Sequence, residues 1–426
     1  MIVRYRLCQL LALSCLIPTL SGCSDRFFVG KMQYEDNAAL TKDLKDRNNL
    51  AGKPGLQNKV RKALAQLYGP DPQNITVPEG MGVLLTAGGA RLANYQRVDQ
   101  SIKRNVGADG KQIAGGYGLF RRHCLHCHGV SGAGDGPTAA FLFPTPRDYR
   151  LGKFKFTSTP NGAPPHRDDL IRTVTSGLHG TSMPAFSSLL SEDEIKQVVD
   201  YVIFLSIRGQ TELELIDVAV ISDPNDPNAL SADDVHDAAQ AVINKWKIAQ
   251  TQVMKPTMPR TPSTRESILR GRDLFLGRVK EAKLVCTDCH GRLAKGDGPS
   301  FVPQDIFNEV VFGGNPSERQ QRIDALDKSM KELWGQKLDD WGNPLRPANL
   351  NLGIYKGGRR PIDIYWRIAK GITGAQMPSH YPGLINEAQL WDLVNFVLEL
   401  PYEPDLLEDA GPSSPAAAES PAVAAR

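Results

Sequence analysis

Two short runs of cysteine and histidine have a spacing that suits one kind of chemistry. Residues 124–129 read C-L-H-C-H-G, and residues 286–291 read C-T-D-C-H-G. In a C-x-x-C-H run the two thiols can add to the vinyl groups of a haem, and the adjacent imidazole can bind the iron. The runs therefore predict two covalently bound haem c groups. The predicted attachment residues are Cys124, Cys127, Cys286 and Cys289, and the predicted histidine ligands are His128 and His290.

Two other uses of a C-x-x-C pair fit less well. A thioredoxin-like redox pair requires a βαβ context, which the sequence around these runs does not provide. A zinc site requires both cysteine pairs to converge on one metal, and it leaves the histidine after each pair unexplained. Haem attachment explains all three residues of each run.

The two runs also begin an internal repeat. Each is followed by G-D-G-P, at 134–137 and 296–299, and later by G-x-x-G-x-x-M-P, at 177–184 and 371–378. The second copy is longer, which we attribute to an insertion at 300–346. The repeat predicts two domains of the same kind.

The order of these motifs resembles the class I c-type cytochrome fold. In that family the attachment run lies near the start, a methionine-bearing loop follows, and a C-terminal helix crosses the first helix. The resemblance implies that His128 and Met183 bind the first iron, and that His290 and Met377 bind the second.

A lone methionine more often fills a core than binds a metal. Its recurrence in the same motif of both copies favours Met183 and Met377 as ligands, and the following proline has a fixed φ that helps hold the loop. His179 and His380 lie close to these methionines and are the alternative ligands.

Each haem histidine also needs a partner for its second ring nitrogen. We expect a backbone carbonyl from Pro144 or Pro146 in the first copy, and from Pro347 in the second, to accept the Nδ1–H. Arg147 is either a partner for a haem propionate or an ordinary surface charge.

We therefore expect a mostly α-helical chain of two tandem cytochrome c-like domains, with an N-terminal extension and a helical linker. Capping boxes predict helix starts at Ser191, Ser231 and Asn386, and helical spacing favours one helix over 317–334. We expect the linker helix, 231–252, to pack between the halves. The expected segments are a lipoprotein signal peptide (1–22), an anchor or extension (23–108), domain one (109–208), a linker with a helix (209–264), domain two (265–403, with the insertion 300–346) and a disordered tail (404–426).

The start of the chain reads as a bacterial export signal, with Arg4 and Arg6 before an apolar run that ends at 20. Residues 20–23 read L-S-G-C, which resembles the lipobox of bacterial lipoproteins, and predict lipidation of Cys23. The alternatives are a retained signal anchor and ordinary cleavage. Several acyl chains on one residue anchor a protein stably, whereas a single chain does so marginally.

The net charge excludes one class of partner. The formal charge is +3, and loss of Arg4 and Arg6 with the leader leaves 3 − 2 = +1, which provides no nucleic-acid footprint. The expected partners are redox donor and acceptor proteins of the cell envelope, and the membrane through lipidated Cys23. The expected location is the periplasmic side of the bacterial envelope.

The sequence favours one function and leaves two alternatives. The favoured one is one-electron transfer by two His/Met haems c, as a membrane-anchored carrier or a cytochrome subunit of a bacterial respiratory chain. The first alternative is a dihaem redox enzyme, a peroxidase or a sulfur-compound dehydrogenase, with one labile distal ligand. The second is a haem-based sensor or scaffold.

Overall fold

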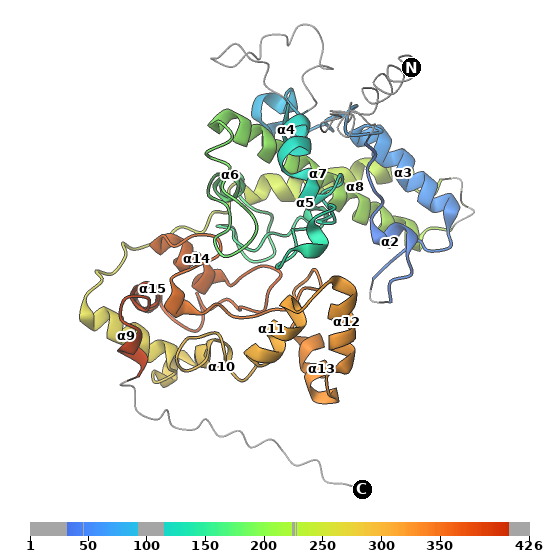
Figure 1. Cartoon of the computed structure of the whole chain (residues 1–426). Coiled ribbons are helices and arrows are strands. Elements are labelled where there is room, and N and C mark those ends of the chain that lie inside the picture. The colour runs from blue at the N-terminus through green and yellow to red at the C-terminus, as the bar shows by residue number, and fades with distance from the viewer. Residues whose placement is uncertain (1–31, 46, 93–114, 224–225, 227, 409–426) are drawn as a thin grey trace, which may run out of the picture.

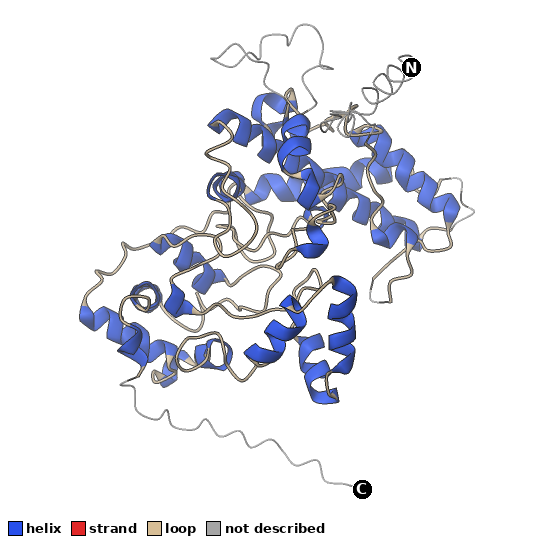
Figure 2. Cartoon of the chain, in the orientation of Figure 1, coloured by secondary structure: helices blue, strands red, loops and turns tan. Residues whose placement is uncertain are grey.

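The computed structural model describes residues 32–45, 47–92, 115–223, 226 and 228–408. Within these ranges the regular elements are all helices, as Figure 2 shows, and the predicted mostly α-helical fold is confirmed. The predicted signal peptide and Cys23 lie outside the described residues, as do residues 409–426 of the predicted tail. The two halves of the chain form the upper and lower parts of Figure 1.

The first half is organised around one long helix, α7 (Glu192–Ile221). It starts at the predicted capping box, in which the Ser191 and Glu194 side chains bond each other's backbone N–H. Its continuation to Ile221 runs past the expected domain boundary at 208. The other helical elements of this half are α4 (Gly116–His123), α5 (Leu125–His128), α6 (Arg167–Ser176), η5 (Ala139–Phe141) and η6 (Tyr149–Leu151).

The described part of the N-terminal extension covers the first half. Its elements are α2 (Ala38–Thr41), α3 (Pro54–Tyr68), η1 (Met81–Leu84) and η2 (Thr86–Gly89). Helix α3 lies against the later turns of α7, where the Tyr68 hydroxyl is 2.7 Å from Thr211 Oγ1. Leu56, Val60 and Tyr68 are buried in the same core as α7. This segment therefore belongs to the core of the first half.

The linker helix α8 (Ala232–Ala249) begins at the predicted capping box of Ser231 and Asp234. It packs on α7 and η1, and the Trp246 Nε1–H donates to Gln210 Oε1 at 2.6 Å. Its apolar stripe is buried in the first core, so our expectation that it packs between the halves is wrong.

The second half has a separate core, built mainly by α9 (Arg265–Phe275) crossing α15 (Glu387–Glu399). Helix α15 starts at the predicted box of Asn386 and Gln389. The remaining elements are η7 (Lys280–Ala282), α10 (Cys286–His290), η8 (Leu350–Leu352), α14 (Pro361–Lys370) and η9 (Pro404–Leu407). The disordered tail does not begin at 404, because Leu406 and Leu407 are buried in this core.

The insertion folds into three helices with a small core of their own. They are α11 (Gln304–Phe312), α12 (Pro316–Ala325) and α13 (Lys328–Gln336). The single helix expected over 317–334 is wrong, because Leu326 is extended and the Asp327 side chain caps a new helix. Phe307 and Trp334 meet at the centre, with ring centroids 5.9 Å apart.

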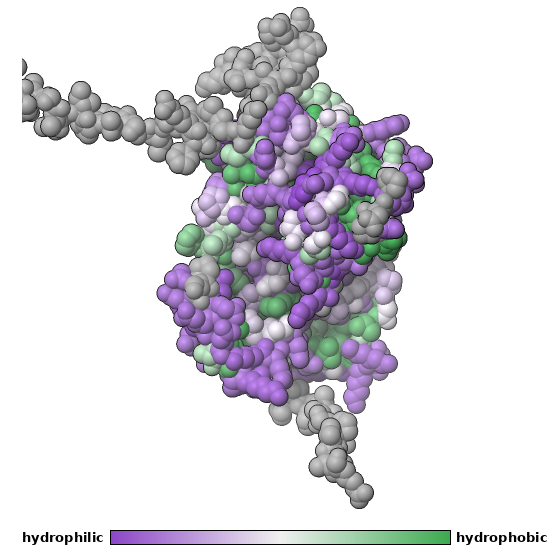
Figure 3. All heavy atoms as spheres, turned by 90° about the vertical axis from the view of Figure 1, so that its right-hand side faces the viewer, coloured by the Kyte–Doolittle hydropathy of each residue, from purple (hydrophilic) through white to green (hydrophobic). Residues whose placement is uncertain are grey.

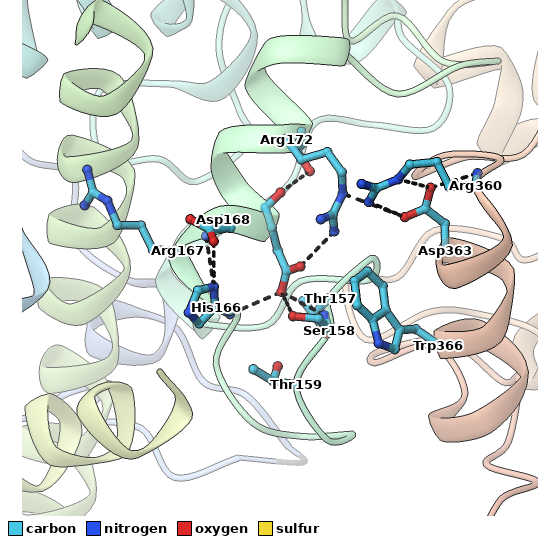
Figure 4. Close-up of polar contacts among 12 residues, drawn as sticks. Thr157, Ser158, Thr159, His166, Arg167, Asp168, Arg172, Arg360, Asp363 and Trp366 are labelled. Atoms are coloured by element: carbon cyan, nitrogen blue, oxygen red, sulfur yellow. Dashed lines mark hydrogen bonds and ion pairs between the residues drawn. The ribbon is translucent and has the colours of Figure 1, made fainter. Parts of the chain in front are cut away.

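The halves face each other through equivalent helices, α6 and α14, shown in Figure 4. Asp169 and Asp363 are the buried capping residues of these helices. Arg172 lies between them, 2.7 Å from Asp169 and 4.0 Å from Asp363. Nearby, the Lys370 ammonium donates to Thr157 Oγ1 at 2.9 Å. The interface is therefore held by buried charges whose partners come from both halves.

The surface in Figure 3 is largely hydrophilic, with hydrophobic residues in small separate areas. Among the described residues, we find no helix with the length and apolar composition needed to cross a bilayer.

The crossing of α9 and α15 depends on Gly271. A Cβ placed there would lie 2.1 Å from the Asp392 carbonyl oxygen, a backbone atom that cannot move aside. We expect Gly271→Ala to destabilise the protein by about 1–3 kcal/mol, as overpacking does. The measurement is the free energy of unfolding from urea titration followed by far-UV circular dichroism.

The matched control is Gly335→Ala, because a Cβ at Gly335 on α13 meets nothing within 4 Å. This variant should be neutral or more stable by up to about 1 kcal/mol, through helix propensity. If Gly271→Ala and the wild type have the same free energy of unfolding, the crossing of α9 and α15 does not depend on a glycine at this position.

Candidate haem sites

The first attachment run ends in a turn that requires glycine. Gly129 has φ +73°, and a Cβ there would lie 2.1 Å from Asp135 Oδ1. The G-D-G-P segment then folds back on the run: Gly134 N–H donates to the His128 carbonyl at 3.0 Å, and Gly136 N–H to the Cys127 carbonyl at 3.2 Å. These contacts explain why C-x-x-C-H-G and G-D-G-P occur together.

The second run forms the same turn. Gly296 N–H donates to the His290 carbonyl at 2.8 Å, and Gly298 N–H to the Cys289 carbonyl at 3.2 Å. A Cβ at Gly291 would lie 2.0 Å from Asp297 Oδ1. The repeat seen in the sequence is thus a repeat of backbone geometry.

Each haem histidine has one ring nitrogen against a backbone carbonyl. His128 Nδ1 is 3.4 Å from the Arg147 oxygen, and His290 Nδ1 is 3.2 Å from the Ala348 oxygen. A carbonyl only accepts hydrogen bonds, so both contacts favour the tautomer with hydrogen on Nδ1 and leave the lone pair of Nε2 for a metal. The Tyr149 ring stacks on His128 at a centroid distance of 4.7 Å.

The expected acceptors, the carbonyls of Pro144 or Pro146 and of Pro347, are wrong. The acceptor in each half is the carbonyl of the residue after Pro146 or Pro347. The Pro146 and Pro347 carbonyls instead point at the glycines of the two G-D-G-P turns, 2.4 Å from where a Cβ of Gly134 or Gly296 would be. Alternate carbonyls of an extended segment face opposite sides. The next carbonyl therefore faces the histidine.

Burial keeps these groups in their neutral forms. It lowers the pKa of His128 to about 4 and also lowers the pKa of His290. It raises the pKa of Cys124 and of Cys286 to about 12 each. A neutral imidazole is the form that binds iron, while thiolates are the form that binds zinc. Among the described residues no cluster of three or more His, Cys, Asp or Glu could hold a metal ion, so the two cysteine pairs do not converge on one zinc.

The methionine loops are pinned in the same way in both halves. Leu178 N–H donates to the Met183 carbonyl at 3.0 Å, and Ile372 N–H to the Met377 carbonyl at 3.1 Å. Gly177 and Gly371, the first glycines of the two motifs, lie so close to these carbonyls that a Cβ would approach within 2.6 Å and 2.4 Å respectively.

The side chains of the two methionines are partly buried. Met183 packs against the first core, which includes Cys124, and Met377 against the second, which also contacts Cys286. Each methionine thus packs on the core that includes or contacts the first attachment cysteine of its own half.

The two alternative ligands occupy different settings. The His179 side chain is exposed. His380 is partly buried, with Nδ1 3.1 Å from the Ile368 carbonyl oxygen. It stands three residues after Met377, where the first half has Phe186 three residues after Met183.

Two arginines carry buried terminal guanidinium nitrogens, Nη1 or Nη2, that make no hydrogen bond to the described residues. They are Arg147, through Nη1, and Arg346, through Nη1 and Nη2. The Arg147 side chain is 19 % exposed, and burial lowers its pKa to about 10, so it is not an ordinary surface charge. The unused hydrogen-bond donors of these two cations fit the carboxylate groups that a haem carries. Sequence reasoning missed Arg346, although it directly precedes Pro347 in the repeated segment.

Comparisons with known proteins agree with this geometry. Residues 111–202 match the family described as cytochrome C oxidase, cbb3-type, subunit III, and residues 268–401 match the family described as cytochrome c. Both matches include a C-x-x-C-H run and its methionine motif. No curated protein has a significant sequence match to the chain.

One solved structure is similar over much of the chain. It is a chain of the reducing HAO-like protein complex of Kuenenia stuttgartiensis, with 23% identity and a TM-score of 0.43, covering 67% of this chain and 94% of that one. At this TM-score we draw nothing from it. The family matches and the repeated geometry lead to one conclusion: the chain contains two cytochrome c domains in tandem, which carry two covalently bound haem c groups and serve haem-based electron transfer.

Proposed function

We propose that this protein transfers single electrons through two His/Met haem c groups, as a membrane-anchored carrier or a cytochrome subunit of a bacterial respiratory chain. One observation carries the proposal. In both halves the haem histidine has its Nδ1 against a backbone carbonyl, and a methionine on a glycine-pinned loop packs on the same core as the first attachment cysteine, Cys124 or Cys286.

The bound haem iron supplies a one-electron couple. The residues around the iron determine its ligands and its reduction potential. Nε2 of His128 and of His290 would be the nitrogen that binds the iron, because the carbonyls of Arg147 and Ala348 face Nδ1. The thioether of Met183 or Met377 favours the reduced iron and raises the potential. If a histidine and a methionine hold each iron, small molecules would have no open site on the metal.

The anchor and the location are part of the proposal. Lipidation of Cys23 would hold the protein at the periplasmic side of the bacterial envelope, beside donor and acceptor proteins of that compartment. This follows from the L-S-G-C run and from the export that haem c attachment requires. The enzyme alternative requires that one iron has a labile distal ligand. The methionine variants below test whether Met183 and Met377 are the distal ligands.

Removing one cysteine pair should remove one haem. We expect the pyridine haemochrome assay to count two haems per chain in the wild type, and one in Cys124→Ala/Cys127→Ala and in Cys286→Ala/Cys289→Ala, because each pair forms its own thioethers. Ser24→Ala is the control and should keep two. A count of one in the wild type contradicts the two-haem assignment.

Loss of each methionine should affect mainly its own haem. In Met183→Ala and Met377→Ala we expect the midpoint potential of that haem to fall and its spectrum to become high-spin, because the thioether is gone. Redox titration followed by absorbance measures both. Met258→Ala, which removes an exposed methionine of the linker, is the control. If both variants keep the wild-type spectrum and potentials, other residues bind the irons, and His380 becomes the first to test.

A further inference from the structure

The end of the insertion presents one aromatic side chain, Trp341, to both haem sites. It lies on a tight turn in which Asp339 Oδ1 accepts hydrogen bonds from the N–H groups of Trp341, at 3.0 Å, and of Asn343, at 2.8 Å. Leu338 and Pro344 pair across the base of this turn. The backbone therefore holds the indole in one place.

One side of Trp341 contacts the segment that orients His128. The Arg147 guanidinium carbon lies 3.5 Å from the ring centroid, a close cation–π contact. The indole Nε1–H donates to the Asp148 carbonyl at 3.3 Å. Trp341 thus holds the chain on both sides of the Arg147 carbonyl, which is the oxygen that faces His128 Nδ1.

The other side of Trp341 contacts the loop that carries Met377. A Cβ at Gly374 would lie 2.4 Å from the indole, so the ring lies directly against this glycine. The neighbouring Asp340 N–H donates to the Gly374 carbonyl at 3.1 Å. Gly374 is the second glycine of the G-x-x-G-x-x-M-P motif in the second half.

Charges around the indole strengthen the contact between the halves. The Asp339 side chain is only 2 % exposed, and its Oδ2 accepts from the Lys155 ammonium at 2.8 Å and lies 3.9 Å from Arg147 Nη1. The Thr145 hydroxyl donates to Asn343 Oδ1 at 2.6 Å. A buried carboxylate with partners in the other half restricts the position of the turn.

We infer that Trp341 is a positioning residue that couples the two haem sites, acting on His128 through Arg147 and on Met377 through Gly374. The inference rests on the proposed His/Met ligands. It gives the insertion a role: it reaches across the interface and makes the geometry of each iron site depend on the other half.

The test is a redox titration of the holoprotein and of Trp341→Ala. The two potentials are assigned to their sites with the Met183→Ala and Met377→Ala variants. We expect Trp341→Ala to shift both midpoint potentials, and Trp341→Phe, which keeps an aromatic ring over Arg147 and Gly374, to restore them in large part.

The matched control is Trp366→Ala. Trp366 also lies at the interface, with the Arg172 guanidinium carbon 5.3 Å from its ring centroid, but its Nε1–H donates to the Met254 carbonyl instead of to the segment that follows Arg147. This variant should leave both potentials unchanged, although it too loosens the interface. Trp341→Ala shifts no larger than those of Trp366→Ala, or a shift at one site alone, would overturn the inference.

A second variant keeps the test decisive if Trp341→Ala does not fold. Gly374→Ala, in the methionine loop of the second site, displaces the indole from that side. We expect it to shift the potential of the first haem, although Gly374 belongs to the methionine loop of the second site; no shift there would count against coupling. Failure of the proposed function can be distinguished from failure of the coupling. In that case electron paramagnetic resonance of the wild type would show ligands other than His and Met.

Discussion

Both haem sites depend on one contact, between a histidine ring nitrogen and a single backbone carbonyl. Arg147 supplies the oxygen for His128, and Ala348 supplies it for His290. The contact selects the tautomer and the orientation of the ring together. It exists because the glycine turn after each C-x-x-C-H run brings an extended segment alongside, with one carbonyl against the turn and the next against the ring. The other parts of each site are the cysteine pair and the methionine loop. They are arranged around a histidine ring that is held in this way.

The parts of the structure that follow from local chemistry could be predicted from the sequence. The helix starts at Ser191, Ser231 and Asn386 lie where the capping boxes indicate, because a cap is satisfied within a few residues. The attachment runs and methionine loops recur in the same order in both halves. The break in the insertion at Leu326 was missed, since helical spacing continues across it and only the Asp327 cap marks the new start.

The parts that depend on distant residues could not be predicted. Which carbonyl faces His128 depends on how an extended segment is placed against a turn, and motif spacing carries no information on that. The partners of Arg172 lie on α6 and α14, far apart in the chain. Nothing near Trp341 in the sequence indicates that its ring lies over Arg147, because the two residues belong to different halves. The sequence indicates which residues are candidate ligands, but it does not indicate how their side chains are oriented.

The two halves differ in how many residues of their hydrophobic cores come from flanking segments. The first core draws on Leu56, Val60 and Tyr68, which precede its C-x-x-C-H run, and on Trp246, which follows α7. The buried residues of the second core all lie within 268–407, and Met254 of the linker packs against them. The hydrophobic core of the second half is therefore nearly self-contained, while its insertion still contacts the first half through Trp341. The core of the first half includes residues of its flanking segments. Transfer of that domain to another protein would therefore have to include those segments.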